Sequence, residues 1–325
     1  MSTAVSSGTA PESPARLSLG DWIVVFKRAF KQFVADDCMG LAQQVAYSSL
    51  LAFFPAVIFL VGLFGLIDIY DDLREFLGVI APSAVLDALD VAEESAAGQS
   101  GAALAVIIGA FGAVWAASGA MGSIIKAVNR AYDRTETRPF WKVRLIAIVL
   151  VALTGLVTAG VFILIVFGGP VGEAIADQAN LGSAFELLWA ILRWPIAFLA
   201  VLLFFALVYY LAPDVEHRSW KWISPGSIVG GILWLALSGL FALYTTFAGS
   251  YDKTYGSLAG AIVLLLWLNY SAFAILFGAE LNSELDRQAD IRASGGEQAG
   301  LTRPSRRHPP PDRSFQTERG QGPRP

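Results

Sequence analysis

The stretch YGSLAGAIVLLLWLNYSAFAILFGAEL, residues 255–281, decides the fold of this 325-residue chain. It is long and apolar enough to cross a bilayer, because a hydrocarbon core of about 30 Å needs roughly 20 apolar residues in a helix. Asn269 interrupts the run and Glu280 closes it. Counted back from Glu280 at about 1.5 Å per residue, Asn269 lies roughly 16 Å into the membrane. An amide at that depth either hydrogen-bonds to neighbouring helices, which is the commoner role, or faces a path for a polar group.

Five further stretches meet the same criterion, and the composition agrees with them: 55% of the residues are hydrophobic, 15% are charged and the mean hydropathy is +0.57. The runs are continuously apolar and do not alternate as the strands of a membrane barrel do. The sequence therefore predicts an all-α membrane protein, a bundle of six transmembrane helices. The spans are predicted at about 43–67, 101–125, 143–168, 187–211, 223–248 and 257–279.

The predicted six-span membrane domain covers residues 38–285, and the chain on either side of it has a different composition. Residues 1–18 are rich in Ser, Thr, Ala and Pro, and residues 286–325 are rich in Arg and Pro, so both are predicted to be disordered. The loop between the first two spans holds an amphipathic stretch broken at Pro82. We expect two short extracytoplasmic helices there.

Residues 19–37 have the pattern of an amphipathic helix. Basic and polar side chains occupy one face, and a helix of this kind lies in the plane of a membrane surface. We expect it on the cytoplasmic leaflet, with a partner-binding helix as the alternative. The residues that share the apolar face are Trp22, Phe26, Ala29, Phe30 and Phe33.

The basic residues are distributed unequally. Of the 23 Lys and Arg residues, 20 fall before the first span, between spans 2 and 3, between spans 4 and 5, or after span 6. The positive-inside rule therefore predicts a multi-pass membrane protein with both termini in the cytoplasm. A basic cytoplasmic face attracts the anionic head groups of membrane lipids, and no nucleic-acid partner is expected.

Four polar residues are predicted to lie in the cytoplasmic half of the spans. We interpret them as the lining of a pathway, with interhelical hydrogen bonding as the alternative. They are Gln44, Tyr47, Ser118 and Asn269.

Charged and aromatic residues near the span ends carry further predictions. Glu280, at the cytoplasmic boundary, is expected to pair with Arg130 or Arg138. Arg193 is expected near the outer surface, where it pairs with an acidic residue of the preceding loop. Tyr255 belongs to a short outer loop whose aromatic residues are typical of a membrane interface.

The sequence carries no pattern of an enzyme active site. Walker, zincin, nucleophile-elbow and dinucleotide-binding motifs are absent, and the chain has only two histidines and one cysteine. We therefore expect neither catalytic residues nor a metal nor another cofactor, and we do not expect an enzyme.

Four segments of the chain resemble the YihY/BrkB family, namely residues 42–66, 115–141, 207–234 and 255–281. The matching features include Ala46-Tyr47, Pro55, Trp115, Asn129, Tyr132, Arg138, Pro213, Pro225-Gly226, Tyr255-Gly256, Trp267 and the closing Gly278-Ala279-Glu280-Leu281. The resemblance covers roughly residues 20–287.

This resemblance implies a six-span bacterial inner-membrane protein. Members of the family are described as envelope-integrity proteins, as factors in serum resistance and as movers of lipids or lipopolysaccharide precursors, and some carry the label ribonuclease BN. A processing nuclease needs a metal site, for which this sequence has no pattern, so the label is disfavoured. We expect a protein that supports envelope integrity by transporting a lipid, such as a lipopolysaccharide precursor, or a small molecule.

Two other readings of the sequence stay open. A non-transporting scaffold that recruits partners or lipids at the cytoplasmic face is the alternative, and a membrane-associated ribonuclease ranks third. A homo-oligomer is compatible with each of the three readings.

Overall fold

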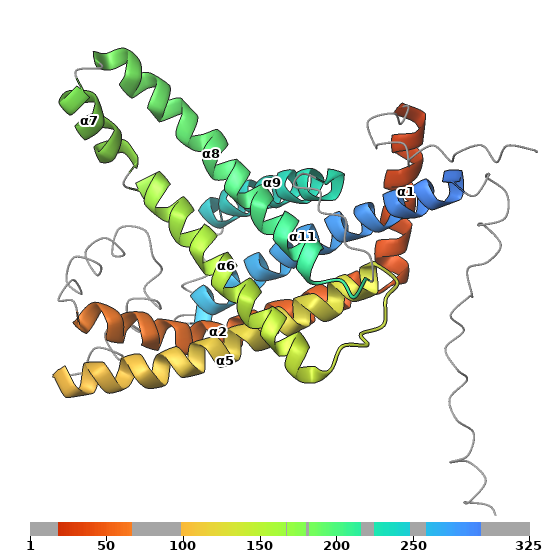
Figure 1. Ribbon diagram of the computed structural model, residues 1–325, viewed down its shortest axis with the longest axis horizontal. Helices are drawn as coiled ribbons and strands as arrows, with labels where there is room; N and C mark the ends of the chain where they lie inside the picture. The colour runs from red at the N-terminus through yellow and green to blue at the C-terminus, as the bar shows by residue number, and fades with distance from the viewer. Residues whose placement is uncertain are drawn as a thin grey trace, which may run out of the picture. The chain divides into compact units, whose positions relative to one another are not determined.

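The part of the chain that the structure describes is built from α-helices, as the continuous apolar runs predict (Figure 1). The computed structural model describes residues 19–66, 99–166, 168–179, 182–215, 224–247 and 258–293. The helices are α1 (Leu19–Ala35), α2 (Cys38–Leu66), α5 (Gln99–Ala131), α6 (Phe140–Val166), α7 (Gly168–Ala179), α8 (Gly182–Leu211), α9 (Pro225–Phe247) and α11 (Leu258–Ala293). Among these residues, six helices are long and apolar enough to cross a membrane: α2, α5, α6, α8, α9 and α11. The predicted six-helix membrane fold is confirmed.

Contacts divide the chain into two units. The helical bundle lies within Leu17–Glu284, and the second unit consists of Met1–Arg16 with Leu285–Pro325. Only the end of α11 is described in the second unit. The helices predicted around Pro82 and the two predicted disordered segments fall outside the described residues, apart from that helix end.

Two membrane helices run further than the hydropathy of their sequences predicts. Helix α5 continues to Ala131, past the predicted end at 125, and α11 continues to Ala293, past the predicted end at 279. Hydropathy marks the apolar part of a helix, whereas the helix ends where its backbone hydrogen bonds end. Polar residues such as Asn129 therefore belong to helices and not to loops.

Helix α1 uses its apolar residues on two faces instead of the one that was predicted. Ala29 and Phe33 are buried, together with Val25, and the ring of Phe33 lies 6.0 Å and 6.1 Å from the rings of Phe273 and Phe277 in α11. Phe30 remains 60% exposed. One face of α1 therefore packs on the bundle, and the other remains exposed.

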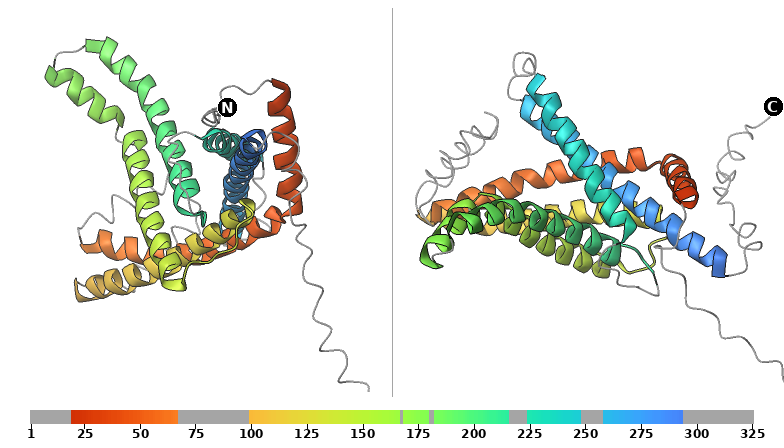
Figure 2. Two further views of the ribbon diagram at one scale, coloured as in Figure 1. Left: turned by 45° about the vertical axis from the view of Figure 1, so that its right-hand side comes forward. Right: turned by 90° about the horizontal axis from the view of Figure 1, so that it is seen from above.

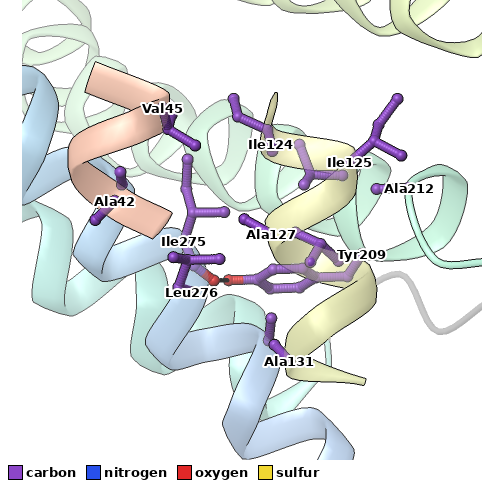
Figure 3. Close-up of a cluster of buried hydrophobic side chains, with 14 of the residues drawn as sticks. Ala42, Val45, Ile124, Ile125, Ala127, Ala131, Tyr209, Ala212, Ile275 and Leu276 are labelled. Atoms are coloured by element: carbon purple, nitrogen blue, oxygen red, sulfur yellow. Dashed lines mark hydrogen bonds between the residues drawn. The ribbon is translucent and has the colours of Figure 1, made fainter. Parts of the chain in front are cut away.

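The buried core lies at one end of the bundle. At this end α2, α6 and α9 begin, and α5 and α8 end; we call it the convergent end, and it corresponds to the side predicted to face the cytoplasm. The hydroxyl of Tyr209 donates a hydrogen bond to the carbonyl of Ile275 at 2.8 Å and joins α8 to α11 inside the core. Four helices and the residue that follows α8 supply this part of the core (Figure 3): Ala42, Val45, Ile124, Ile125, Ala127, Ala131, Tyr209, Ala212, Ile275 and Leu276.

Away from the convergent end the helices separate into pairs (Figure 2). Helices α2 and α5 stay in contact, since a Cβ at Gly109 would lie only 2.7 Å from the backbone nitrogen of Phe59. Helix α6 contacts α8. Helix α9 is joined to α11 by the indole of Trp267, which donates to the hydroxyl of Ser238 at 3.2 Å. No described side chain is buried in the distal segments 53–59, 151–165, 182–196, 232–244 and 260–271.

Helix α7, which the sequence analysis left as part of a loop, packs on the start of α8. The indole of Trp189 donates a hydrogen bond to the carbonyl of Gly168 and lies over Gly172. A side chain at Gly172 would collide with that ring, so glycine is required for this close approach.

Candidate functional site

The largest polar cluster of the described residues lies at the convergent end, where the loop between α5 and α6 meets the end of α8. Asn129 is 2% exposed and connects these elements. Its amide nitrogen donates to Oε2 of Glu136 at 2.8 Å, and its amide oxygen accepts from the backbone N–H of Asp214 at 2.7 Å. Both hydrogen-bonding groups of this buried amide are therefore used within the chain.

Arg138 is the centre of the same cluster, and its side chain is only 5% exposed. Its Nε and Nη2 donate to the two carboxylate oxygens of Glu136, each at 2.7 Å, in the bidentate geometry that matches a guanidinium to a carboxylate. Nη2 also donates to the carbonyl of Ala212 at 2.8 Å, and Nε lies 3.7 Å from Oδ1 of Asp214. The backbone N–H and hydroxyl of Thr137 donate to Oδ2 of Asp214 at 2.8 Å and 2.6 Å.

These contacts change the protonation behaviour of the cluster. The hydrogen bonds from Arg138 hold the pKa of Glu136 below its ordinary value, and the hydrogen bond from the Thr137 hydroxyl lowers the pKa of Asp214. The carboxylate of Glu136 raises the pKa of Arg138 in turn. All three groups are therefore charged near neutral pH, and the cluster acts as a clamp between α5 and α8.

Of the four residues that the family resemblance singled out here, the structure brings Asn129 and Arg138 into this cluster. Tyr132 packs against the buried core nearby. Glu136 and Asp214 were not identified from the sequence. Glu136 could have been identified from the sequence, because it lies two residues before Arg138. Asp214 lies 85 residues from Asn129, and nothing in the sequence around it indicates that the two residues are in contact.

Glu280, the fourth of these residues, occupies a separate buried position between α2 and α11. It is 0% exposed, and its Oε1 accepts a hydrogen bond from the thiol of Cys38 at 3.5 Å. Its Oε2 has no hydrogen-bond partner in the described structure. The predicted pairing with an arginine is wrong, because Arg130 pairs with Asp36 at 3.1 Å and Arg138 pairs with Glu136.

No hydrogen bond of the described structure joins the four residues interpreted as a pathway to one another. Ser118 is buried and donates to the carbonyl of Trp115 at 2.9 Å, a bond within its own helix. Gln44 is exposed, Tyr47 is 61% exposed and Asn269 is half-buried. The pathway stays a prediction.

The arginine expected near the outer surface has other neighbours than those predicted. The guanidinium of Arg193 lies 5.8 Å from the ring centroid of Trp194, and its Nε is buried without a hydrogen-bond partner. No ion pair joins it to Glu173 or Glu186 in the described structure. Tyr255 lies outside the described residues.

A second arginine, Arg144, lies one turn inside α6, within the span predicted at 143–168. Its guanidinium lies 4.2 Å from the ring centroid of Trp115 in α5, and its Nη2 donates to the carbonyl of the same residue at 2.7 Å. No group of His, Cys, Asp and Glu side chains in the described residues could hold a metal ion.

A bundle of six apolar helices with polar clusters at one end defines an integral membrane protein. The model of the family described as Virulence factor BrkB matches residues 29–301, and this chain belongs to that family. The family resemblance inferred from the sequence is thus confirmed.

Known proteins of several bacteria are similar to this chain. It is 31% identical over 269 residues to a ribonuclease-like protein, YfkH, of Bacillus subtilis, a match that covers 82% of this chain and 96% of the relative. It is 24% identical to a UPF0761 membrane protein of Aggregatibacter aphrophilus, over 84% of this chain and 95% of the relative. A UPF0761 membrane protein of Stenotrophomonas maltophilia is 27% identical over 78% of this chain, which spans only 59% of that relative. No solved structure matches the chain.

Proposed function

We propose that this protein moves a lipid between the leaflets of the bacterial inner membrane and thereby supports the integrity of the cell envelope. The observation that carries the proposal is the uneven burial of the six membrane helices. Their convergent ends share one core, whereas no described side chain is buried in the distal segments of α6, α8, α9 and α11. Apolar surfaces between separating helix pairs suit acyl chains better than a water-soluble substrate.

A lipid head group that crosses the membrane needs polar partners along its way, since each unsatisfied polar group in hydrocarbon is costly. Tyr47 and Gln44 are exposed on α2 and are available as partners at the convergent end. Asn269 is half-buried in α11. We propose that these residues, with Ser118, line the route of the head group.

The proposed orientation places the convergent end and both termini in the cytoplasm. The distribution of Lys and Arg supports this orientation, because basic residues are enriched in the segments that adjoin the convergent end. Fusions of a reporter enzyme to the two termini and to the loop after α9 test it, and a periplasmic terminus would reverse it.

Reconstitution in liposomes tests the transport proposal. Vesicles of phosphatidylethanolamine and phosphatidylglycerol that carry a trace of nitrobenzoxadiazole-labelled lipid are treated with dithionite, which bleaches only the outer leaflet. We expect bleaching beyond the outer-leaflet share when the protein is present. Asn269→Leu should abolish this excess, and Tyr270→Phe, the matched control on the same helix, should retain it.

The folding of each variant is checked by thermal unfolding in detergent. Asn269→Leu protein that is folded and fully active would show that Asn269 is not part of the route. If Asn269→Leu does not fold, normal transport by both Tyr47→Phe and Gln44→Leu would reject the route. No lipid movement by the wild-type protein would reject transport of these lipids.

A scaffold that recruits partners at the cytoplasmic face is the second candidate, and the exposed basic face of α1 favours it. Lys27, Arg28 and Lys31 are all exposed on this helix. Deletion of residues 1–18 and 288–325, combined with replacement of Lys27, Arg28 and Lys31 by Gln, separates the two functions in a cell-envelope stress assay. A transporter should retain its function after these changes, whereas a scaffold that acts through this face and these segments should lose it.

The description 'ribonuclease-like' belongs to the Bacillus relative and is not carried over to this chain. We propose that the present chain acts without enzymatic chemistry, since its sequence carries no catalytic pattern. Cleavage of RNA by the purified protein, abolished by His217→Ala, would reverse this conclusion.

A further inference from the structure

Arg144 presents a cation at the surface of two membrane helices without an acidic partner. Its guanidinium stacks over the indole of Trp115 and donates one hydrogen bond to the backbone carbonyl there. No carboxylate of the described residues lies within ion-pair distance of it. A guanidinium has five N–H donors, so several of them are available to a ligand.

The position of Arg144 along α6 places it near a membrane interface. Helix α6 begins with Phe140 and Trp141, which are both largely exposed, and aromatic residues of this kind mark the level of lipid head groups. Arg144 follows Trp141 by one turn. Its guanidinium lies against α5, at Trp115 and beside Gly119.

The guanidinium lies directly against the neighbouring helix. A Cβ at Gly119 would lie 3.7 Å from Nη1 of Arg144, which is an ordinary van der Waals distance. Trp115 remains 61% exposed although it supports the cation, so its ring faces the surroundings of the bundle. The cation and the ring thus form a small oriented site that is open to the bilayer.

We propose that Arg144 and Trp115 bind the phosphate group of a phospholipid in the leaflet at which α6 begins. An uncompensated charge within a membrane helix is costly, and a lipid phosphate supplies the missing negative charge at the depth of the guanidinium. The planar guanidinium donates two parallel hydrogen bonds to phosphate oxygens, and the indole holds the plane of the cation in place. The site does not rest on lipid transport, because a scaffold could hold the same lipid.

Native mass spectrometry of the full-length protein in detergent tests this site. Delipidated protein is titrated with phosphatidylglycerol, and the population with one bound lipid is measured. We expect Arg144→Gln to weaken the tightest binding by about tenfold or more, the effect of losing a charge-assisted hydrogen bond. Lys142→Gln removes an exposed cation from the same turn of α6 and should change this binding by less than about twofold.

Further measurements separate the phosphate site from a general attraction to basic residues. Arg144→Lys keeps the charge but loses the planar fork, so its binding should fall between the wild type and Arg144→Gln. Inorganic phosphate at the same concentration should not displace the lipid. Equal lipid binding by the wild type and by folded Arg144→Gln would overturn the proposal, as would displacement by inorganic phosphate. If Arg144→Gln does not fold, wild-type affinity in Arg144→Lys overturns it.

Discussion

The thiol of Cys38 at the start of α2 donates a hydrogen bond to Oε1 of Glu280 in α11, 3.5 Å away, and both side chains are fully buried. The other oxygen of this carboxyl group has no partner in the described structure. An ionised carboxylate in such a position carries a desolvation cost that one weak thiol donor does not offset. This hydrogen bond therefore joins α2 to α11, but it leaves the second carboxylate oxygen of Glu280 without a hydrogen-bond partner.

Glu280→Gln should keep the fold and raise its stability by about 1–3 kcal/mol, because the amide oxygen still accepts from Cys38 and the ionisable group is gone. Glu280→Ala should lower the stability by about 2–4 kcal/mol, because it removes the acceptor and leaves a cavity. Thermal unfolding in detergent measures both changes. If Glu280→Gln destabilised the fold as strongly as Glu280→Ala, the carboxylate would have an unseen charged partner. A loss of lipid movement in a stable Glu280→Gln protein would add a role for this group in transport.

Arg138→Ala should destabilise the fold by about 1–3 kcal/mol, since it removes two hydrogen bonds to Glu136 and the donor to the carbonyl of Ala212. Arg134→Ala, an exposed arginine of the same loop, is the control and should change the stability by less than about 1 kcal/mol. Urea unfolding of the detergent-solubilised protein compares the two. Similar losses for both variants would mean that the clamp does not hold α5 and α8 together.

Acid should weaken the same clamp. The folded-state pKa values of Glu136 and Asp214 are lowered from ordinary values of 4.5 and 3.8, so their contribution to stability is present above those values. It is lost as the pH falls through the lower folded-state values, where both groups bind protons in the folded protein too. Glu136→Gln should flatten this part of the stability profile. An unchanged slope between about pH 5 and pH 2 would show that the group does not titrate as inferred.

The sequence was sufficient to predict the six apolar helices but not the polar contacts between them. Hydropathy reports each segment by itself, so the spans were located while the ends of α5 and α11 were placed too early. Asn129 and Arg138 were identified by family resemblance, whereas Asp214 joins them only through folding. No spacing of residues in the sequence predicts a contact of that kind.

The same limit explains why Arg144 and α1 were interpreted incompletely. Arg144 falls within the span predicted at 143–168, but its contact with an aromatic ring of α5 forms only in the folded chain. Only part of the apolar face predicted for α1 is buried, because α11 covers that part and the rest remains exposed. Periodicity identifies an apolar side chain and leaves open what covers it.

The two faces of α1 provide a matched pair of substitutions. Phe33→Ala should destabilise the bundle by about 3–5 kcal/mol, since Phe33 is 6% exposed and packs on two rings of α11. Phe30→Ala should change the stability by less than about 1 kcal/mol, because its ring contributes little to the buried core. Thermal unfolding distinguishes them. Equal effects would show that α1 does not pack through Phe33.

The closest approach between α9 and α11 leads to the last prediction. A Cβ at Gly278 would meet the hydroxyl of Tyr209 and would lie 2.5 Å from the carbonyl oxygen of Gly226, so neither neighbour leaves room for it. Gly278→Ala should therefore force α8, α9 and α11 apart and destabilise the fold by about 2–3 kcal/mol. Gly239 lies in α9 with nothing within 4 Å of a Cβ, and Gly239→Ala should leave the fold as stable or add up to about 1 kcal/mol.

Thermal unfolding and gel filtration of these two variants compare the same chemical change at a closed and an open position. Gly278→Ala should unfold at a lower temperature and lose the single monodisperse peak, while Gly239→Ala should match the wild type. Because both substitutions add one methyl group and raise helix propensity equally, a difference between them reports helix contact alone. If the two variants were equally stable, the α8–α9–α11 contact would be looser than the positions of Tyr209 and Gly226 indicate.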